Sequence, residues 1–275
     1  MRYPAPAKLN LFLHVTGRRA DGFHNLETIF QLIDLCDELQ ISVRKDGDIR
    51  REPAPSSAVL ASLADADDLT VRAARLLQQA SGSTHGADLH VDKRIPAGGG
   101  LGGGSSDAAT VLLVLNRLWE LHWPRARLAE LALELGSDVP VFIHGKTAFG
   151  RGRGEELTPL QLPPRWYLIV DPGVAVATRS VFNAPELTRD TPALKIAALP
   201  AGGGRNDCEA VVRQRYPEVA RVLDLLAPWG GRMTGSGACV FVAADSREAL
   251  QAPAAAASAV WQTFVARGLD HSPVA

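Results

Sequence analysis

The sequence predicts an α+β protein of two domains, and three observations support this. Its 275 residues are many for one domain and comfortable for two. In the first half, predicted strands and apolar helices surround a glycine-rich loop at residues 96–107. In the second half, helices alternate with strands that suit an antiparallel sheet in an α/β sandwich. Glycines at residues 150–154 separate the halves, so we place the domains at residues 1–153 and 154–275.

The composition excludes several classes of protein. With 29 basic and 30 acidic residues the formal net charge is −1, so no overall positive field would hold a nucleic acid. Cys36, Cys208 and Cys239 are far apart and odd in number, which fits a reducing compartment and argues against disulfides and a zinc site. The seven histidines are scattered, so a transition-metal site built by the protein is not expected.

No membrane segment is predicted. Pro4, Pro6 and Lys8 interrupt the apolar N-terminal stretch, which is therefore unlike the core of a signal peptide. Residues 249–266 carry no charge, but alanine, proline and glutamine make them too polar for a spanning helix. We expect a surface helix followed by a strand there, and a cytoplasmic protein.

A strand is predicted at residues 7–15, where side chains alternate between two faces. One face is apolar, and the other is expected to carry Lys8, Asn10, Phe12 and His14. Lys8 and Asn10 are two residues apart on a strand, so both side chains point the same way and can reach one ligand. The alternative is an edge strand whose Lys8 faces solvent.

The remaining elements follow from periodicity, caps and turn residues. Those of the first half are a turn at 17–22 that presents Phe23 and His24, a strand near 39–43, a helix capped by Asp67 and Asp68 to about Gln79, a strand near 89–91, a core helix behind the glycine loop, a helix at 124–135 and a short helical segment to His144. Those of the second half are a strand at 166–170, a short helix from Thr178 through Phe182, helices at 206–216 and 217–226, and a strand at 238–242. The glycines at residues 230–237 allow close contact with a ligand or with the neighbouring domain.

The glycine-rich loop is the strongest signal in the sequence. Six of the seven residues at 98–104 are glycine, which destabilises any helix or strand and indicates a use for the bare backbone. An anion can approach the main-chain N–H groups, and Ser105, Ser106 and Asp107 then open a helix whose N-terminus favours negative charge. We interpret the loop as a phosphate-binding site formed by Pro96, Ala97, Gly98, Gly99, Gly100, Leu101, Gly102, Gly103, Gly104, Ser105 and Ser106.

Other glycine motifs fit less well. The dinucleotide fingerprint is met literally at residues 98–103, but it should follow a strand at once, and the downstream acid Glu120 lies inside a helical pattern. A Walker loop needs a lysine where Gly104 stands. A flexible linker is the remaining alternative, although linkers rarely join a strand to a strongly apolar helix.

Asp138 stands at the start of the helical segment that ends at His144. It could be only an N-terminal cap for that segment. A carboxylate fixed at a helix start would also have the defined direction that a proton acceptor needs. The two roles are compatible.

Six motifs together resemble the GHMP small-molecule kinases. In order they are residues 6–11, 21–24, 96–106, 136–140, 206–207 and 235–238. The likeness covers nearly the whole chain, which is far more specific than the glycine loop alone. It implies an N-terminal α/β nucleotide-binding domain, a ferredoxin-like C-terminal α/β sandwich, and ATP and Mg²⁺ as cofactors. The pattern is most similar to the branch that phosphorylates the 2-hydroxyl of a cytidine diphosphate-linked polyol in non-mevalonate isoprenoid synthesis.

The resemblance also implies roles for single residues. Asp138 would accept the proton of the acceptor hydroxyl, and Lys8 would hold Asp138 ionised while ATP phosphates bind the glycine loop. Lys93 or Arg94 would lie beside the adenine. The residues implied for the cytidine end of the substrate are Asn10, Phe23, His24, Thr178 and Phe182. The ligands of Mg²⁺ are not identified.

Two residues depart from the family pattern. Phe23 stands where a tyrosine is frequent, and Asp107 where asparagine is common. The extra charge of Asp107 should be mildly unfavourable beside phosphates unless it caps the helix or faces Mg²⁺.

Two other functions stay open. The chain could instead phosphorylate homoserine, mevalonate or a sugar, or serve as an inactive nucleotide sensor. A monomer or weak homodimer is expected.

Overall fold

The structure is a computed structural model that describes residues 1–52, 64, 66–194 and 204–274. Its strands are β1 (Arg2–Arg18), β2 (His24–Arg44), β3 (Ile49–Arg51), β4 (Gly86–Asp92), β5 (Ala148–Arg151), β6 (Glu156–Pro159), β7 (Trp166–Asp171), β8 (Arg232–Met233), β9 (Val240–Ala244) and β10 (Gln262–Leu269). Its helices are α2 (Leu69–Ser81), α3 (Gly103–Leu118), α4 (Arg125–Ala132), α5 (Val139–His144), α6 (Thr178–Phe182), α7 (Glu209–Arg215), α8 (Pro217–Leu226) and α9 (Gln251–Ser258), with the 3₁₀ turns η2 (Ala227–Trp229) and η3 (Glu248–Leu250). The α+β prediction is confirmed.

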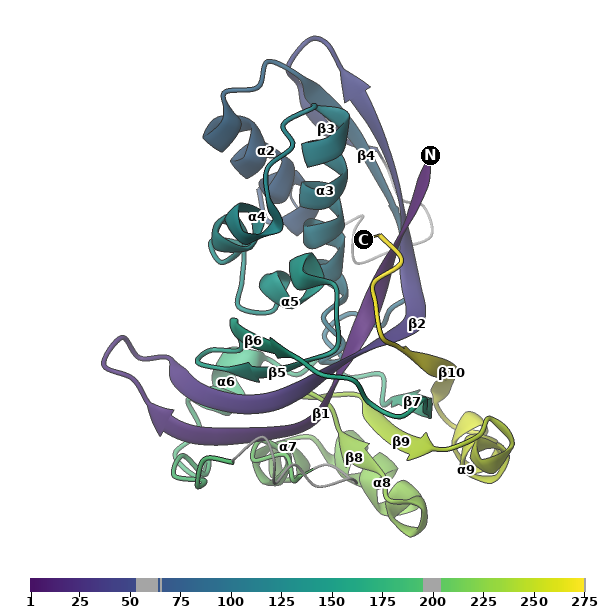
Figure 1. Cartoon of the computed structure of the whole chain (residues 1–275). Helices are drawn as coiled ribbons and strands as arrows, with labels where there is room; N and C mark the ends of the chain where they lie inside the picture. Colours follow the sequence, from purple (N-terminus) through teal and green to yellow (C-terminus); the bar gives the residue numbers. More distant parts are fainter. Residues whose placement is uncertain (53–63, 65, 195–203, 275) are drawn as a thin grey trace.

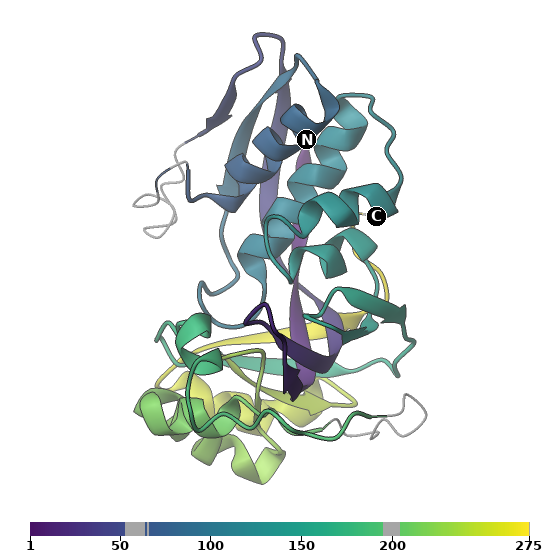
Figure 2. The same ribbon diagram turned by 90° about the vertical axis from the view of Figure 1, so that its left-hand side faces the viewer.

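A long antiparallel pair, β1 and β2, runs through the whole molecule (Figure 1). The main path of the sheet is β3-β4-β2-β10-β7-β9-β8, and β10 joins its two parts by pairing with both β2 and β7. Helices α2 to α5 pack beside the upper part of this pair, whereas α7 to α9 lie under β7 to β9 (Figures 1 and 2). The predicted boundary at residue 153 falls between the paired strands β5 and β6, and it stays a prediction.

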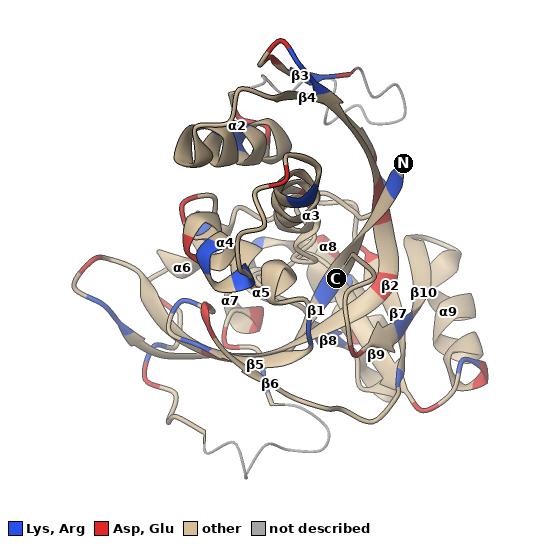
Figure 3. Cartoon of the chain, turned by 45° about the horizontal axis from the view of Figure 1, so that its top comes forward, with Lys and Arg blue, Asp and Glu red and all other residues tan. Residues whose placement is uncertain are grey.

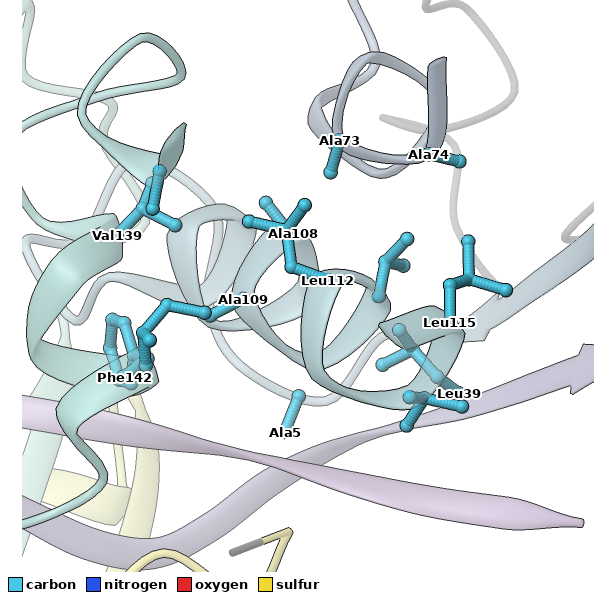
Figure 4. Packing of buried hydrophobic residues seen from close by; sticks show 14 of the residues in the cluster. Ala5, Leu39, Ala73, Ala74, Ala108, Ala109, Leu112, Leu115, Val139 and Phe142 are labelled. Carbon is cyan, nitrogen blue, oxygen red and sulfur yellow. The ribbon is translucent and has the colours of Figure 1, made fainter. Parts of the chain in front are cut away.

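Helix α3 lies at the centre of the first hydrophobic core (Figure 4). The figure shows alanines of α2 on one of its sides, residues of α5 on another, and residues of β1 and β2 along a third. The labelled side chains of α3 itself, Ala108, Ala109, Leu112 and Leu115, are all buried. The prediction of a core helix behind the loop is therefore confirmed, and the packing fixes where its N-terminus points.

The helix ends follow the predicted caps, with small shifts. Asp68 caps α2 by accepting a hydrogen bond from Thr70 N at 2.7 Å, and Gly82 ends that helix at φ 68°. Helix α3 begins at Gly103, two residues before its predicted start. Helix α4 ends at Ala132, before the predicted residue 135, because the next amides bond three residues back as turns.

The predicted assignment of side chains to the two faces of β1 is correct to Asn10 but wrong after it. A register shift between Asn10 and Leu13 bends β1 and moves the following side chains to the opposite face. Leu13 therefore lines the same cavity as Lys8 and Asn10. Phe12 instead packs into a separate buried cluster, and the His14 ring lies 4.8 Å from it.

Charged residues of both signs are interspersed over the molecule, as the composition indicates (Figure 3). The predicted helix and strand near the C-terminus are α9 and β10. Across the described ranges, no helix combines the length and the apolar character that crossing a membrane requires.

Candidate active site

Two cavities meet at the glycine loop. The larger has a volume of about 980 Å³ and the smaller one about 350 Å³. Residues 96–105 line the smaller cavity, together with Lys93 and Asp107. Gly100, Gly102 and Ser105 line both, so groups bound in the two cavities would be neighbours.

The loop needs its glycines for conformation and for close packing. Gly98, Gly100 and Gly102 have φ of 71°, 76° and 72°, a region that side chains disfavour. A Cβ on Gly100 would lie 2.4 Å from the carbonyl oxygen of Thr234, and Cys239 N donates to Gly99 O at 3.0 Å. The loop is thus seated against the segment before β9, which excludes a flexible linker.

The second glycine segment, residues 235–238, contacts the glycine loop and also lines a cavity. It packs on the glycine loop, as the Gly100 contact shows, and Gly235 and Ser236 also line the larger cavity. Asn206 holds this segment by donating to Met233 O at 3.0 Å and Gly235 O at 2.8 Å. The sequence motif at 206–207 therefore positions the wall of the cavity.

The two serines behind the loop differ in position. Ser105 lines both cavities. Ser106 is fully buried and is not among the described residues that line either cavity. Gly102, which precedes α3, provides no side-chain cap, so the first N–H groups of the helix are available to an anion.

Lys8 connects the loop to the larger cavity. Its Nζ donates to Asn10 Oδ1 at 2.5 Å and to Gly100 O at 3.0 Å. The same Nζ lies 3.2 Å from Asp138 Oδ2, which gives the ammonium three acceptors for its three protons. The Lys8 side chain is 3% exposed, so the alternative of a solvent-facing edge lysine is wrong.

Asp138 stands at the N-cap of α5, yet its carboxylate makes no capping hydrogen bond. The side chain is 40% exposed, lines the larger cavity and pairs with Lys8. A role as a cap alone is therefore excluded. An ionised carboxylate in this position can accept a proton from a hydroxyl group bound near the shared wall of the cavities.

Asn10 is fixed by two threonines that the sequence analysis did not select. Its Nδ2 donates to Thr28 Oγ1 at 2.8 Å, and its backbone N donates to Thr234 Oγ1 at 2.8 Å. These bonds turn the amide oxygen toward Lys8. The one available local signal was a threonine just before Gly235, because Thr28 lies among other polar residues of its strand, such as Glu27 and Gln31.

The aromatic residues expected around a pyrimidine meet in the larger cavity. His24 and Phe182 come from opposite halves of the chain, and their ring centroids are 5.4 Å apart. Phe23 is 49% exposed, and the Arg153 guanidinium lies 4.8 Å from its ring centroid. Thr178 Oγ1 is 2.8 Å from Ser236 Oγ. The residues lining the cavity include all the predicted ones, namely Asn10, Phe23, His24, Thr178 and Phe182.

His24 has a defined proton arrangement. Burial, with the positive charges of Arg189 and Arg18, lowers its pKa. Arg189 Nε donates to His24 Nε2 at 3.1 Å, so that nitrogen is an acceptor. The neutral ring then carries its proton on Nδ1, which can donate to a ligand.

The larger cavity also has a cationic lining that sequence reasoning missed. Arg18, Arg153 and Arg179 contribute to it beside Lys8. Arginines are common on protein surfaces, so the sequence holds no signal that distinguishes these three.

Lys93 lines the smaller cavity, but its ammonium is already paired with two carboxylates. It forms ion pairs with Asp37 and Asp107. Within the described ranges, no three His, Cys, Asp or Glu side chains are grouped so as to hold a metal ion.

Known proteins are similar to this chain over nearly its whole length. The family model for the GHMP kinases N terminal domain matches residues 68–146, and the model for the GHMP kinases C terminal region matches residues 190–262. Relatives named 4-diphosphocytidyl-2-C-methyl-D-erythritol kinase are 56% identical in Thiobacillus denitrificans, over 99% of this chain and 96% of that protein, and 52% identical in Halorhodospira halophila, over 99% and 94%.

Solved structures agree with the sequence relatives. A crystal structure of 4-(cytidine 5'-diphospho)-2C-methyl-D-erythritol kinase has 34% identity and a TM-score of 0.82, covering 98% of this chain and 99% of that one. A crystal structure of mevalonate kinase has 13% identity and a TM-score of 0.69, covering 98% and 100%, and so shares the fold alone.

Proposed function

The chain belongs to the GHMP kinase family, and we propose on that premise that it transfers a phosphoryl group from ATP to the 2-hydroxyl of 4-diphosphocytidyl-2-C-methyl-D-erythritol, a step in isoprenoid precursor synthesis. The observation that carries this is the 56% identity, over nearly the full length of both chains, to a kinase of that name. The geometry agrees, because an aromatic cavity adjoins a glycine loop at the Lys8 and Asp138 pair.

The ATP phosphates would lie along the glycine loop in the smaller cavity. Backbone N–H groups of the loop and the free N-terminus of α3 suit an anion. Mg²⁺ would be held chiefly by phosphate oxygens, which fits a described site that has no acidic cluster arranged for a metal. Bound there, the ion would neutralise phosphate charge.

The acceptor hydroxyl would lie beside Asp138, at the wall shared by the cavities. Asp138 takes its proton as the hydroxyl oxygen bonds to the γ-phosphorus, and the bond from that phosphorus to the β–γ bridging oxygen breaks to release ADP. Lys8 holds the Asp138 carboxylate in place through their ion pair and offsets the negative charge that develops. Positioning and electrostatics supply most of the catalysis in phosphoryl transfer, so these two side chains and the loop suffice.

The cytosine would stack with Phe23 and Phe182, while His24 reads its edge. Nδ1–H of His24 can donate to the carbonyl oxygen of the base. The arginines that line the same cavity would balance the charge of the diphosphate.

Replacing Phe182 by Ala should raise the KM for the diphosphocytidyl acceptor by about 5- to 150-fold, because stacking on one aromatic ring stabilises a base by roughly 1–3 kcal/mol. The kcat should change much less, since the reacting hydroxyl lies elsewhere. Steady-state assays at saturating ATP measure both constants. Trp229→Ala, an aromatic residue of η2 outside both cavities, is the matched control. An unchanged acceptor KM in both Phe23→Ala and Phe182→Ala would show that these rings do not hold the cytosine.

A coupled assay for ADP release tests the proposed function directly. The diphosphocytidyl acceptor should support turnover, while homoserine and mevalonate at the same concentration should not. Turnover with either of those substrates instead would assign the chain to another activity of the family. Intact ATP binding with no turnover on any acceptor would indicate a nucleotide-binding protein without kinase activity.

The cellular location and the oligomeric state are part of the same proposal. Three unpaired cysteines and the use of ATP support a cytoplasmic location. A monomer or weak homodimer is proposed, and light scattering across a range of protein concentrations checks the mass in solution.

A further inference from the structure

Both ends of the glycine loop meet at one buried ammonium group. Lys93 comes just before the loop, and its Nζ pairs with Asp37 of β2 and, at 2.8 Å, with Oδ2 of Asp107 in the first turns of α3. The other oxygen of Asp37 accepts hydrogen bonds from Arg94 N at 2.6 Å and Ile95 N at 2.8 Å. Asp37 therefore fixes the entry to the loop, and Lys93 connects that entry to the exit.

The group is shielded from solvent and lies against the loop. The side chains of Asp37, Asp107 and Lys93 are 0%, 4% and 14% exposed. A Cβ added to Gly103 would lie 3.2 Å from the ammonium nitrogen, so the cation is packed against the first residue of α3. Lys93 and Asp107 both line the smaller cavity, where they would face a bound nucleotide.

Two carboxylates share this one ammonium, which leaves a buried excess of negative charge when both are ionised. Among the described residues, Oδ1 of Asp107 has no hydrogen-bond partner. Burial raises the pKa of Asp107 to about 7, with Asp37 adding to the shift and Lys93 opposing it. From the start of α2, Asp67 and Asp68 line the same cavity, and Asp68 is paired with Arg51.

We propose that Asp107 is a positioning residue that, together with Asp37, holds Lys93 so that one ammonium joins the two ends of the phosphate loop. This inference rests on the proposed binding of ATP in the smaller cavity. The proposed role also explains why an aspartate is tolerated beside bound phosphates, because the Asp107 carboxylate is paired with Lys93. When Asp107 gains a proton, the net charge of Lys93, Asp37 and Asp107 together changes from −1 to zero. The electrostatic repulsion between these side chains and ATP then falls.

The proposal fixes the sign of a pH effect on ATP binding. A ligand that binds the protonated form better loses affinity as the pH rises through the titration of that group. The Kd of the wild-type chain for ATP with Mg²⁺ should therefore increase by about three- to tenfold between pH 6 and pH 8.5. Asp107→Asn keeps an oxygen that can accept from Lys93 but removes the titration, so its Kd should lack this increase.

The decisive quantity is the ratio of the two Kd values at each pH, measured by calorimetry without acceptor. The titration of ATP itself is common to both proteins and cancels in this ratio. Asp224→Asn, on the exposed face of α8, is the matched control and should follow the wild type. A ratio that stays constant across the pH range would overturn the inference. Failure of the wild type to bind ATP at any pH would instead overturn the proposed function.

The pH dependence of the melting temperature is a second test, and the direction of the expected change is again defined. A carboxyl whose pKa is raised in the folded state contributes stability at low pH that is lost as the pH rises from its ordinary value toward about 7. Asp107→Asn should therefore raise Tm at pH 8 relative to wild type, and this gain should shrink toward pH 4. An unchanged Tm difference across that range would contradict a titrating Asp107.

A double-mutant cycle tests whether the ammonium is shared. In the wild-type background, Lys93→Met removes the cation from two buried carboxylates, those of Asp37 and Asp107. In the Asp107→Asn background, it removes the cation from the carboxylate of Asp37 alone. The loss of ATP affinity caused by Lys93→Met should therefore be several-fold larger in the wild-type background than in Asp107→Asn. Equal losses in the two backgrounds would show that the residues act independently. Unfolding curves establish that each variant is folded at the pH of the measurement.

Discussion

Replacing Asp138 by Asn should lower kcat by about 10²–10⁴-fold, the range typical for loss of a general base. The amide has nearly the same shape but cannot take the proton of the acceptor hydroxyl. ATP binding should persist, because the glycine loop and α3 are separate from this side chain. Stability should change little, since the carboxylate is 40% exposed and caps no helix.

The measurements are kcat from ADP release and the Kd for ATP from calorimetry. Asp245→Asn is a suitable control, because that side chain is 86% exposed and pairs only with Arg165 among the described residues. If Asp138→Asn turns over at close to the wild-type rate, the proton must go elsewhere and the assignment of the base is wrong.

The sequence predicted those features that depend on neighbours along the chain. Six glycines in seven positions disfavour both helix and strand and so indicate a loop, and the Ser-Asp start of α5 places a carboxylate whatever the rest of the fold does. Lys8 and Asn10 share a face because they are two residues apart on a strand, and their 2.5 Å hydrogen bond confirms it.

The features that it did not predict depend on partners far apart in the sequence. A register shift after Asn10 exchanged the faces of β1, and only the pairing with β2 shows where that shift falls. Thr234 fixes Asn10 from 224 residues away, and Asp37 reaches Lys93 across 56 residues. Such contacts are set by the packing of the sheet, so a single sequence carries no local signal for them.

Replacing Lys8 by Met should slow catalysis strongly and also destabilise the fold. Asn10 Oδ1 and Gly100 O would lose a buried donor, and each unsatisfied group costs about 1–3 kcal/mol. The free energy of unfolding should therefore fall by roughly 2–6 kcal/mol, measured by urea denaturation. The kcat should fall by about 10²–10⁴-fold, because neither Asp138 nor the transferring phosphoryl group keeps its cation.

Lys8→Arg separates charge from geometry. It keeps the positive charge, but its planar fork is wider than an ammonium, and the site is tight: Lys8 Cε lies 3.1 Å from the position of a Cβ on Gly102. We therefore expect Arg to recover part of the stability and little of the activity. In the double variant with Asp138→Asn the losses of kcat should be far from additive, because the pair acts as one unit. Additive losses would mean that Lys8 serves the loop alone, and that Asp138 does not depend on it.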